Sequence, residues 1–126
     1  MTVYDGSLYL PQAIESVLSQ TLPPFEIIIV DDKSSDNSRE IIAGYKSRYP
    51  DIIKDIYNEQ NCGISVSRNI AISQCSGSII TYLDGDDIFY RKKLEHEYNF
   101  LTENKHIEIV YSNFNYISSG GEIHGI

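Results

Sequence analysis

The chain has 126 residues, 41% of them hydrophobic, and a formal net charge of −8. This length allows one compact domain with a buried core and leaves no room for a second domain. The acidic balance argues against an exposed nucleic-acid interface, because that partner requires a basic face and the sequence clusters basic residues only at Arg91-Lys92-Lys93.

Helical and strand patterns alternate along the chain, which is typical of the α/β class. The first expected elements are a helix capped by Ser7 that ends near Gln20, a buried strand at 25–30, a helix capped by Ser35 or Asp36 that ends before Pro50, and a weaker strand at 52–57. There follow a helix at about 65–74, a strand ending at Asp84, a helix at 91–101, and a long strand at 107–117 before a hairpin turn at Ser119-Gly120-Gly121. We therefore predict a mostly parallel sheet flanked by helices.

The segment from Thr2 to Gly6 has the character of a loop that leaves a strand and enters a helix, yet no strand precedes it. A doubly wound sheet normally opens with that strand, so we expect the first strand to be missing. The sheet edge left open would need a partner, and we expect self-association to cover it.

Two further features bear on the location of the chain. The longest apolar run, Ile27 to Val30, is much too short to span a bilayer, and no signal peptide precedes it. Cys62 and Cys75 lack the close pairing of a zinc site, so we expect two reduced thiols. We therefore expect the chain to be cytoplasmic.

The most informative segment, Ile79 to Asp87, predicts a buried strand with Asp84, Asp86 and Asp87 at its C-terminal end. Three carboxylates within four residues repel one another and are tolerated mainly if a hard cation or several hydrogen-bond donors lie among them. Magnesium and manganese ions take one or two protein carboxylates and complete their coordination with water and phosphate oxygens. The segment therefore predicts a metal-bridged phosphate ligand, with a plain Asp-rich turn as the alternative.

A second pair of carboxylates, Asp31 and Asp32, follows another buried strand. Because ligands of open parallel sheets bind outside the carboxyl ends of the strands, both acidic clusters can face one site. Arg68 lies about one turn inside the helix that follows the Asn61-Cys62-Gly63 turn. Its guanidinium can reach a base carbonyl or a phosphate there while neutralising one aspartate, and the alternative is an ordinary surface pair with an acid.

Five segments, in this order and spacing, resemble the family 2 inverting glycosyltransferases of GT-A fold: Thr2–Gly6, Ala13–Thr21, Phe25–Asp32, Asn61–Asn69 and Leu83–Asp87. The resemblance covers nearly the whole chain. It implies a Rossmann-like GT-A nucleotide-diphospho-sugar transferase fold, truncated at both ends. Residues 1–126 would then be a single donor domain that binds a nucleotide sugar and lacks the first strand and the acceptor half.

The resemblance also implies a nucleoside site. Thr2 and Tyr4 would contact the nucleobase and ribose, with the Tyr4 ring packed on the base. Asp32 would accept a hydrogen bond from the ring N–H of the base, which favours uracil and hence a UDP-sugar, and Arg68 would close the same pocket. Asp5 stands where the family often has Asn.

The acidic cluster matches the family's Asp-x-Asp motif. The resemblance directs Asp84 toward the ribose or the metal and makes Asp86 the more direct ligand of a divalent cation, Mn²⁺ or Mg²⁺, on the diphosphate. That ion would stabilise the leaving nucleoside diphosphate. Asp87 is expected only to cap the following turn.

In the resembled family the general base belongs to the acceptor half, so we expect it beyond Ile126. Surface positions are expected for the remaining candidates, His96, His106, Glu122 and His124. We therefore expect this chain to bind its donor and, by itself, to be inactive. Inverting sugar transfer to a glycan or lipid-linked acceptor would belong to the intact protein, and the family's usual setting is bacterial surface polysaccharide synthesis at the inner face of the membrane.

Two other classes of protein fit parts of the pattern. A phosphoacceptor receiver domain also has an acidic pair after one strand and a lone Asp after a later one, but its pair ends the opening strand, and here a helix precedes Asp31. A non-catalytic nucleotide-binding module derived from the glycosyltransferase fold is the second alternative.

Overall fold

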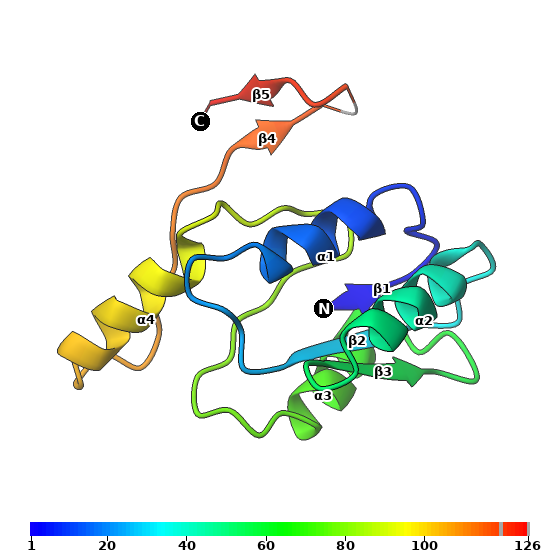
Figure 1. Ribbon diagram of the computed structural model, residues 1–126, viewed down its shortest axis with the longest axis horizontal. Helices are drawn as coiled ribbons and strands as arrows, with labels where there is room; N and C mark the ends of the chain where they lie inside the picture. The colour runs from blue at the N-terminus through cyan, green and yellow to red at the C-terminus, as the bar shows by residue number, and fades with distance from the viewer. Residues whose placement is uncertain (119, 126) are drawn as a thin grey trace. The chain divides into compact units, whose positions relative to one another are not determined.

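The computed structural model describes residues 1–118 and 120–125 (Figure 1). These residues form two compact units, Met1–Glu95 and His96–Ile126. No helix in the described part of the chain is long and apolar enough to cross a membrane.

The first unit is built from alternating strands and helices, as the sequence predicted. Its elements are β1 (Thr2–Val3), α1 (Leu10–Leu18), β2 (Ile27–Asp31), α2 (Ser38–Arg48), β3 (Ile53–Tyr57), α3 (Ile64–Ser73) and the start of α4 (Lys93–Glu103). The three strands are parallel and lie in the order β1-β2-β3, with Thr2 opposite Val30 and Ile27 opposite Ile53.

Strand β2 carries apolar side chains on both faces, because successive residues of a strand point to opposite sides. Ile27 and Ile29 belong to the cluster that contains the buried residues of α1 and α2. Ile28 and Val30 instead pack with Ala71 of α3. The sheet is therefore covered by α1 and α2 on one face and by α3 on the other.

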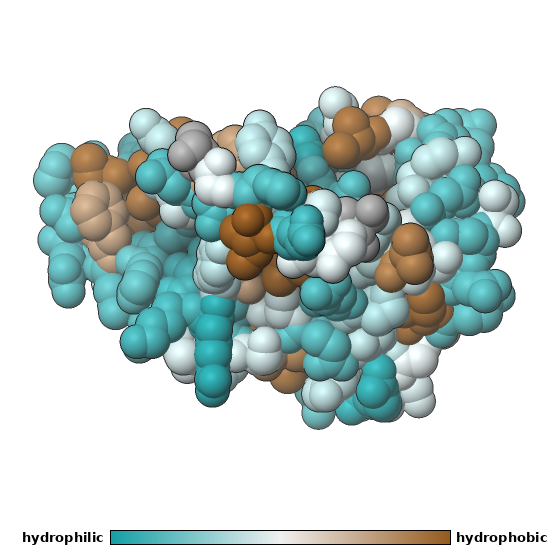
Figure 2. All heavy atoms as spheres, turned by 90° about the horizontal axis from the view of Figure 1, so that it is seen from above, coloured by the Kyte–Doolittle hydropathy of each residue, from teal (hydrophilic) through white to brown (hydrophobic). Residues whose placement is uncertain are grey.

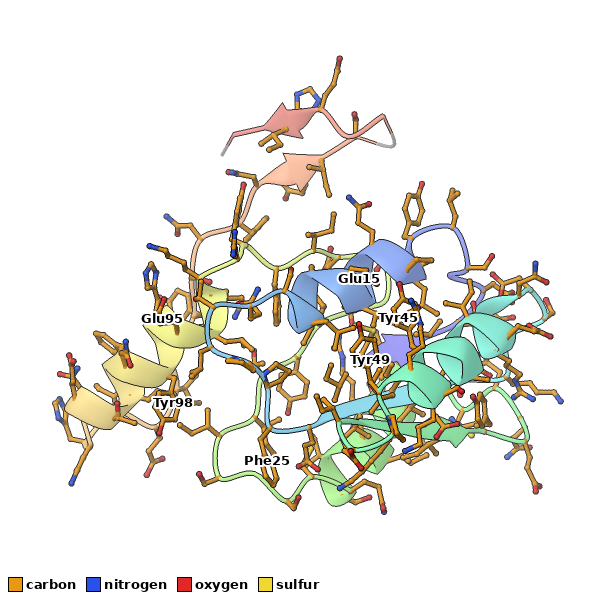
Figure 3. The ribbon with its side chains drawn as sticks, viewed as in Figure 1. Glu15, Phe25, Tyr45, Tyr49, Glu95 and Tyr98 are labelled. Atoms are coloured by element: carbon orange, nitrogen blue, oxygen red, sulfur yellow. The ribbon has the colours of Figure 1, made fainter. Side chains whose placement is uncertain are left out.

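Helices α1 and α2 are joined by a polar contact between the buried Tyr45 and the exposed Glu15. The Tyr45 hydroxyl donates to Glu15 Oε1 at 2.9 Å and approaches the Pro11 carbonyl at 3.4 Å, and Figure 3 shows the Glu15 and Tyr45 side chains directed toward each other. Burial raises the pKa of Tyr45, with the hydrogen bond to Glu15 acting in the same direction.

The expectation that Thr2 and Val3 are loop residues is wrong. They form β1 and are buried, because β1 lies between β2 and the segment at Asp84. The Val30 N–H donates to the Met1 carbonyl at 3.0 Å, and the Asp32 N–H donates to the Val3 carbonyl at 2.8 Å.

Two of the strand predictions are also wrong. Residues 79–83 form no strand, and only Asp84 makes a single parallel bridge, with Thr2. The reason is that β1 is two residues long and offers this segment a backbone partner only at Asp84. The side chains of Ile79, Ile80 and Tyr82 are accordingly exposed. Residues 107–115 likewise form no strand, and Ile109 and Tyr111 are more than four-fifths exposed.

Smaller corrections concern where elements begin. Helix α1 starts at Leu10 without a side-chain cap, because residues 6–9 form a turn that places Tyr9, and not Ser7, at the N-cap position. The Ser7 N–H instead donates to Asp36 Oδ2 at 2.8 Å. Asp36 also accepts the Ser38 N–H at 3.0 Å, but the N-cap residue of α2 is Asn37, whose side chain makes no capping bond, so the expected cap by Ser35 or Asp36 is wrong. Phe25, which we placed in a buried strand, is 78% exposed.

The second unit contains most of α4 and a hairpin of β4 (Tyr116–Ile117) and β5 (Ile123–His124). The predicted hairpin turn is confirmed, with Ser119 lying outside the described residues. Its Ser118 N–H donates to the Glu122 carbonyl at 2.9 Å, and Gly121 takes a φ of +84°, which favours glycine. Viewed from above, the surface of the chain is mainly hydrophilic with separate hydrophobic patches (Figure 2).

Candidate functional site

The two acidic clusters flank β1 at the carboxyl end of the sheet. On one side, Val3 accepts the N–H of Asp32, which follows β2. On the other side, Thr2 bridges to Asp84 and accepts the Gly85 N–H at 3.1 Å. Tertiary structure thus brings together carboxylates that are separated by about fifty residues of sequence, at the edge where open α/β sheets bind ligands.

Gly85 allows this close approach of the Asp84 segment to β1. A Cβ atom on residue 85 would lie 3.0 Å from Val3 Cγ2 and 3.3 Å from the Thr2 carbonyl oxygen. The middle residue of the Asp-Gly-Asp sequence is therefore fixed by packing against a buried strand.

Asp84 forms an ion pair with Arg68 of α3. Arg68 Nη2 lies 2.8 Å from Asp84 Oδ1 and 2.7 Å from Oδ2, and the Thr2 hydroxyl approaches Oδ1 at 3.3 Å. The two charged side chains are 39% and 33% exposed, so a ligand can reach them. Arg68 Nε is buried and has no hydrogen-bond partner in the described part of the chain. Sequence analysis placed Arg68 in the pocket of Asp32, whereas the structure pairs it with Asp84.

Asp32 is almost completely buried and holds the loop before α3. Its Oδ1 accepts the Asn58 side-chain amide and the Cys62 N–H, and its Oδ2 accepts the Gly63 N–H, each at 2.8 Å. Burial raises the pKa of Asp32, but these bonds, together with one from the Ser67 hydroxyl, lower it more and keep the carboxyl below its usual range. Asp32 is therefore a charged, fixed acceptor at the strand end.

Gly63 gives this loop its geometry. It adopts a φ of +83° and serves as the residue before α3, so its N–H can point at Asp32 while the helix begins at the next residue. Cys62 and Cys75 are both free, as expected.

Asp86 and Asp87 lie in the exposed turn that follows Asp84. The Asp87 N–H donates to the Asp84 carbonyl at 3.2 Å, which closes the turn. Burial raises the pKa of Asp87, and the negative charges of Asp86 and Asp84 raise it further. Repulsion of this kind is what a divalent cation would relieve, so the donor set fits a hard metal ion. No group of three candidate metal ligands forms within the described residues, so an ion here would need oxygen atoms from water or phosphate.

Tyr4 and Asp5 follow β1 into a loop that hydrogen bonds tie to the start of α2. Tyr4 is 58% exposed and available for stacking. Asp5 adopts a φ of +47°, and its Oδ1 accepts the Ser35 N–H at 2.6 Å while its own N–H donates to the Ser34 hydroxyl at 3.0 Å. Asp and Asn tolerate this backbone conformation better than most residues.

The sequence analysis did not identify Arg39 and Asn58, which donate hydrogen bonds to Asp31 and Asp32 respectively. Arg39 Nε donates to the fully buried Asp31 at 2.7 Å, and its Nη2 donates to the Asn58 carbonyl at 3.0 Å. Asn58 in turn contacts Asp32 and the Ser67 hydroxyl. The available signal was positional, because Asn58 directly follows β3 as Asp32 follows β2.

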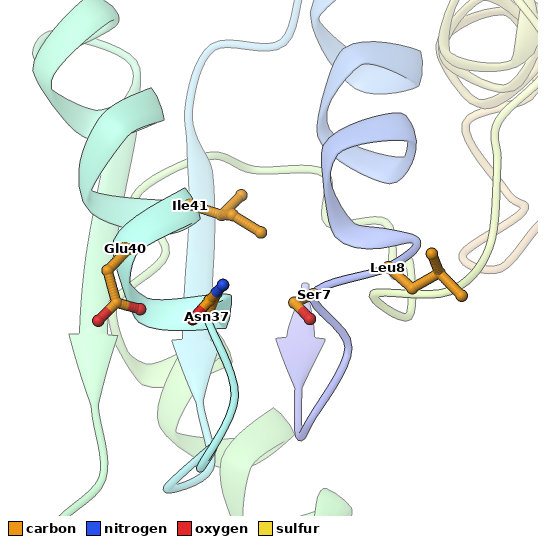
Figure 4. Close-up of a pocket in the computed structure, with 5 residues that line it drawn as sticks. All are labelled: Ser7, Leu8, Asn37, Glu40 and Ile41. Atoms are coloured by element: carbon orange, nitrogen blue, oxygen red, sulfur yellow. The ribbon is translucent and has the colours of Figure 1, made fainter.

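A surface cavity of about 670 Å³ lies elsewhere. It is lined by residues at the starts of α1 and α2: Ser7, Leu8, Asn37, Glu40 and Ile41 (Figure 4). None of the predicted site residues lines it, and the Glu40 carboxylate in it would repel a phosphate, so we assign the chemistry to the acidic edge.

The candidates for a general base that the sequence offered are His96, His106, Glu122 and His124. All four are exposed in the second unit, as expected.

A model of glycosyl transferase family 2 matches residues 1–125. GgaA of Bacillus subtilis (strain 168), a minor teichoic acid biosynthesis protein, is 37% identical over 112 residues, which are 85% of this chain and 25% of GgaA. The chain spans less than half the length of the curated relatives it matches.

Solved structures share the same architecture. S. aureus TarS in complex with UDP-GlcNAc is 28% identical, with a TM-score of 0.76 over 82% of this chain and 30% of that chain. The mannosyltransferase PcManGT from Pyrobaculum calidifontis, in complex with GDP-Man and Mn²⁺, has a TM-score of 0.70 over 79% of this chain and 30% of that chain; at 20% identity it shows a common fold.

Proposed function

This chain belongs to glycosyl transferase family 2 and has a GT-A fold, and from that premise we propose that its acidic edge binds the nucleoside diphosphate of a sugar donor together with a divalent cation. The observation that carries the proposal is the cluster of Thr2, Arg68 and Asp84, with Asp86 in the turn that follows. The cluster places a guanidinium, a hydroxyl and two carboxylates at the ligand-binding edge of the sheet. Family membership leaves the receiver-domain alternative without support.

For the nucleoside we propose UDP. Asp32 is charged and is fixed at the ligand-binding edge of the sheet by hydrogen bonds from Asn58, Cys62 and Gly63. It can therefore accept the N–H of a uracil ring, with the exposed Tyr4 ring stacked on the base. TarS, which was solved with UDP-GlcNAc, supports this choice over the GDP-Man of the more distant PcManGT.

For the metal we propose a divalent cation, Mn²⁺ or Mg²⁺, bound by Asp86 and bridged to the diphosphate. The ion would supply Lewis-acid stabilisation of the leaving diphosphate. Arg68 lies close enough to Asp84 to balance one carboxylate, which leaves the charge of Asp86 for the cation.

Beyond donor binding, we propose that the whole protein transfers the sugar with inversion to a glycan or lipid-linked acceptor in surface polysaccharide synthesis, in the cytoplasm at the inner face of the membrane. The biosynthetic name of GgaA supports this setting. We propose further that residues 1–126 act as one donor domain, that the general base comes from outside the described residues so that the chain alone is inactive, and that self-association covers the open edge of the sheet.

Calorimetric titration tests the central proposal. The chain is titrated with UDP, ADP and GDP, each with Mn²⁺ and with EDTA. We expect UDP with Mn²⁺ to bind tightest. Equal binding of all three nucleotides in Mn²⁺ would refute the base assignment, and UDP binding as tight in EDTA as in Mn²⁺ would refute the metal assignment. The gain from Mn²⁺ is the ratio of UDP affinity in Mn²⁺ to UDP affinity in EDTA. Asp86→Ala should abolish this gain and Asp87→Ala should reduce it less. If the two variants behave alike, Asp86 is not the principal ligand.

A further inference from the structure

The turn that carries Asp86 and Asp87 is anchored at both ends by buried residues. Before the turn, Gly85 is bonded to Thr2 and Leu83 lies in the core. After the turn, Phe89 returns to the same core. Residues 86–88 between these anchors are exposed, so the position of their carboxylates depends on where the anchors are held.

The anchor after the turn is made by Ser16 of α1 and by Gln20, which lies two residues beyond the end of α1. The Phe89 N–H donates to the Ser16 hydroxyl at 3.1 Å. The side chain of Gln20 donates to the Tyr90 carbonyl at 2.9 Å, and its Oε1 accepts the Leu94 N–H at 3.0 Å. These bonds join parts of the chain that are 70 to 74 residues apart in sequence.

Gln20 suits this task chemically. It is 5% exposed, and its amide also donates to the Ser16 carbonyl at 2.9 Å, so both N–H groups and the oxygen are bonded. A carboxylate in its place would present oxygen to two carbonyl oxygens, with no hydrogen to donate. Only an amide of this length satisfies the Tyr90 carbonyl and the Leu94 N–H together.

We propose that Ser16 and Gln20 are positioning residues that set the place of the Asp86-Asp87 turn and thereby determine how tightly the donor site holds a divalent cation. The inference rests on the proposed donor and metal function. Residues that orient metal ligands through hydrogen bonds commonly contribute roughly 10–100-fold to metal affinity. Ser16 and Gln20 act at longer range, through the backbone of residues 89–94.

The test compares UDP affinity in Mn²⁺ with UDP affinity in EDTA for the wild-type chain and for Gln20→Glu. Because these residues act at longer range than a direct partner of a metal ligand, the expected result is a several-fold loss, about 10-fold at most, in the gain from Mn²⁺, with the affinity in EDTA unchanged. Gln12→Glu makes the same chemical change at an exposed position of α1 and should leave the gain at its wild-type value. Ser16→Ala removes the acceptor for the Phe89 N–H together with a bond within α1 to the Ala13 carbonyl. It should lower the gain in the same direction and is the variant to use if Gln20→Glu does not fold.

Three results would overturn the inference. A folded Gln20→Glu chain with the wild-type gain from Mn²⁺ would show that the turn does not depend on this anchor. An equal loss of affinity in Mn²⁺ and in EDTA would indicate a general structural role. The absence of any gain from Mn²⁺ in the wild-type chain would instead refute the proposed metal function itself, and the positioning role with it.

Discussion

Arg68 on α3 and Asp84 beside β1 form a two-point contact, with one guanidinium nitrogen 2.8 Å and 2.7 Å from the two carboxylate oxygens. Both side chains are partly exposed. Pairs of this kind contribute little to folding because water screens them. Their value lies in holding a positive and a negative group at the ligand edge of the sheet.

Arg68→Ala should therefore separate binding from stability. We expect the free energy of unfolding to change by less than about 1 kcal/mol, because the ion pair is partly solvated. UDP affinity should fall, since the guanidinium is lost from the site. Lys92→Ala removes an equal charge at an exposed position and should leave affinity unchanged. Urea unfolding and calorimetry measure the two quantities, and wild-type affinity in Arg68→Ala would remove Arg68 from the site.

Asn58→Ala should destabilise the chain and weaken UDP binding together. The substitution removes one hydrogen bond to the buried Ser67 hydroxyl and one to the charged Asp32 carboxylate, and such bonds contribute about 0.5–3 kcal/mol each. Asp32 would also lose one of the bonds that fix its orientation. Asn69→Ala is the matched control, because Asn69 is exposed on α3. Equal unfolding free energies for the two variants would show that Asn58 does not hold Asp32.

Gly85→Ala and Gly44→Ala should have opposite effects on stability. A Cβ on residue 85 would crowd Val3 and the Thr2 carbonyl, and overpacking of this kind costs about 1–3 kcal/mol. A Cβ on residue 44, inside α2, meets nothing within 4 Å, and alanine there should stabilise by about 0.5–1 kcal/mol. Thermal unfolding measures both, and a Gly85→Ala chain as stable as wild type would contradict the packing described here.

The stability of the chain should fall in acid partly through Glu26. The Lys54 ammonium at 2.6 Å, followed by the N–H groups of Ser76 and Gly77, lowers the pKa of Glu26 from 4.5 to about 2. Because the folded-state pKa is the lower one, this contribution is fully present above pH 4.5 and is lost as the pH falls toward 2. Urea unfolding between pH 2 and pH 7 should show a shallower acid decline for Glu26→Gln, and an unchanged decline would place the titration elsewhere.

The sequence by itself determined the α/β class, the order of the helices and the central strand, because each depends on local features: the Ile27–Val30 apolar run, the helical spacing of Ile14 and Val17, and the Gly63 turn before α3. The two acidic clusters could also be predicted from the sequence, because each is a short local motif. Only the tertiary structure decided which of them meet, since the Arg68–Asp84 pair depends on α3 packing beside β1. It also decided that residues 79–83 and 107–115 form no strands, because a strand requires a neighbouring backbone as well as a suitable sequence, and β1 offers the first of these segments a partner only at Asp84.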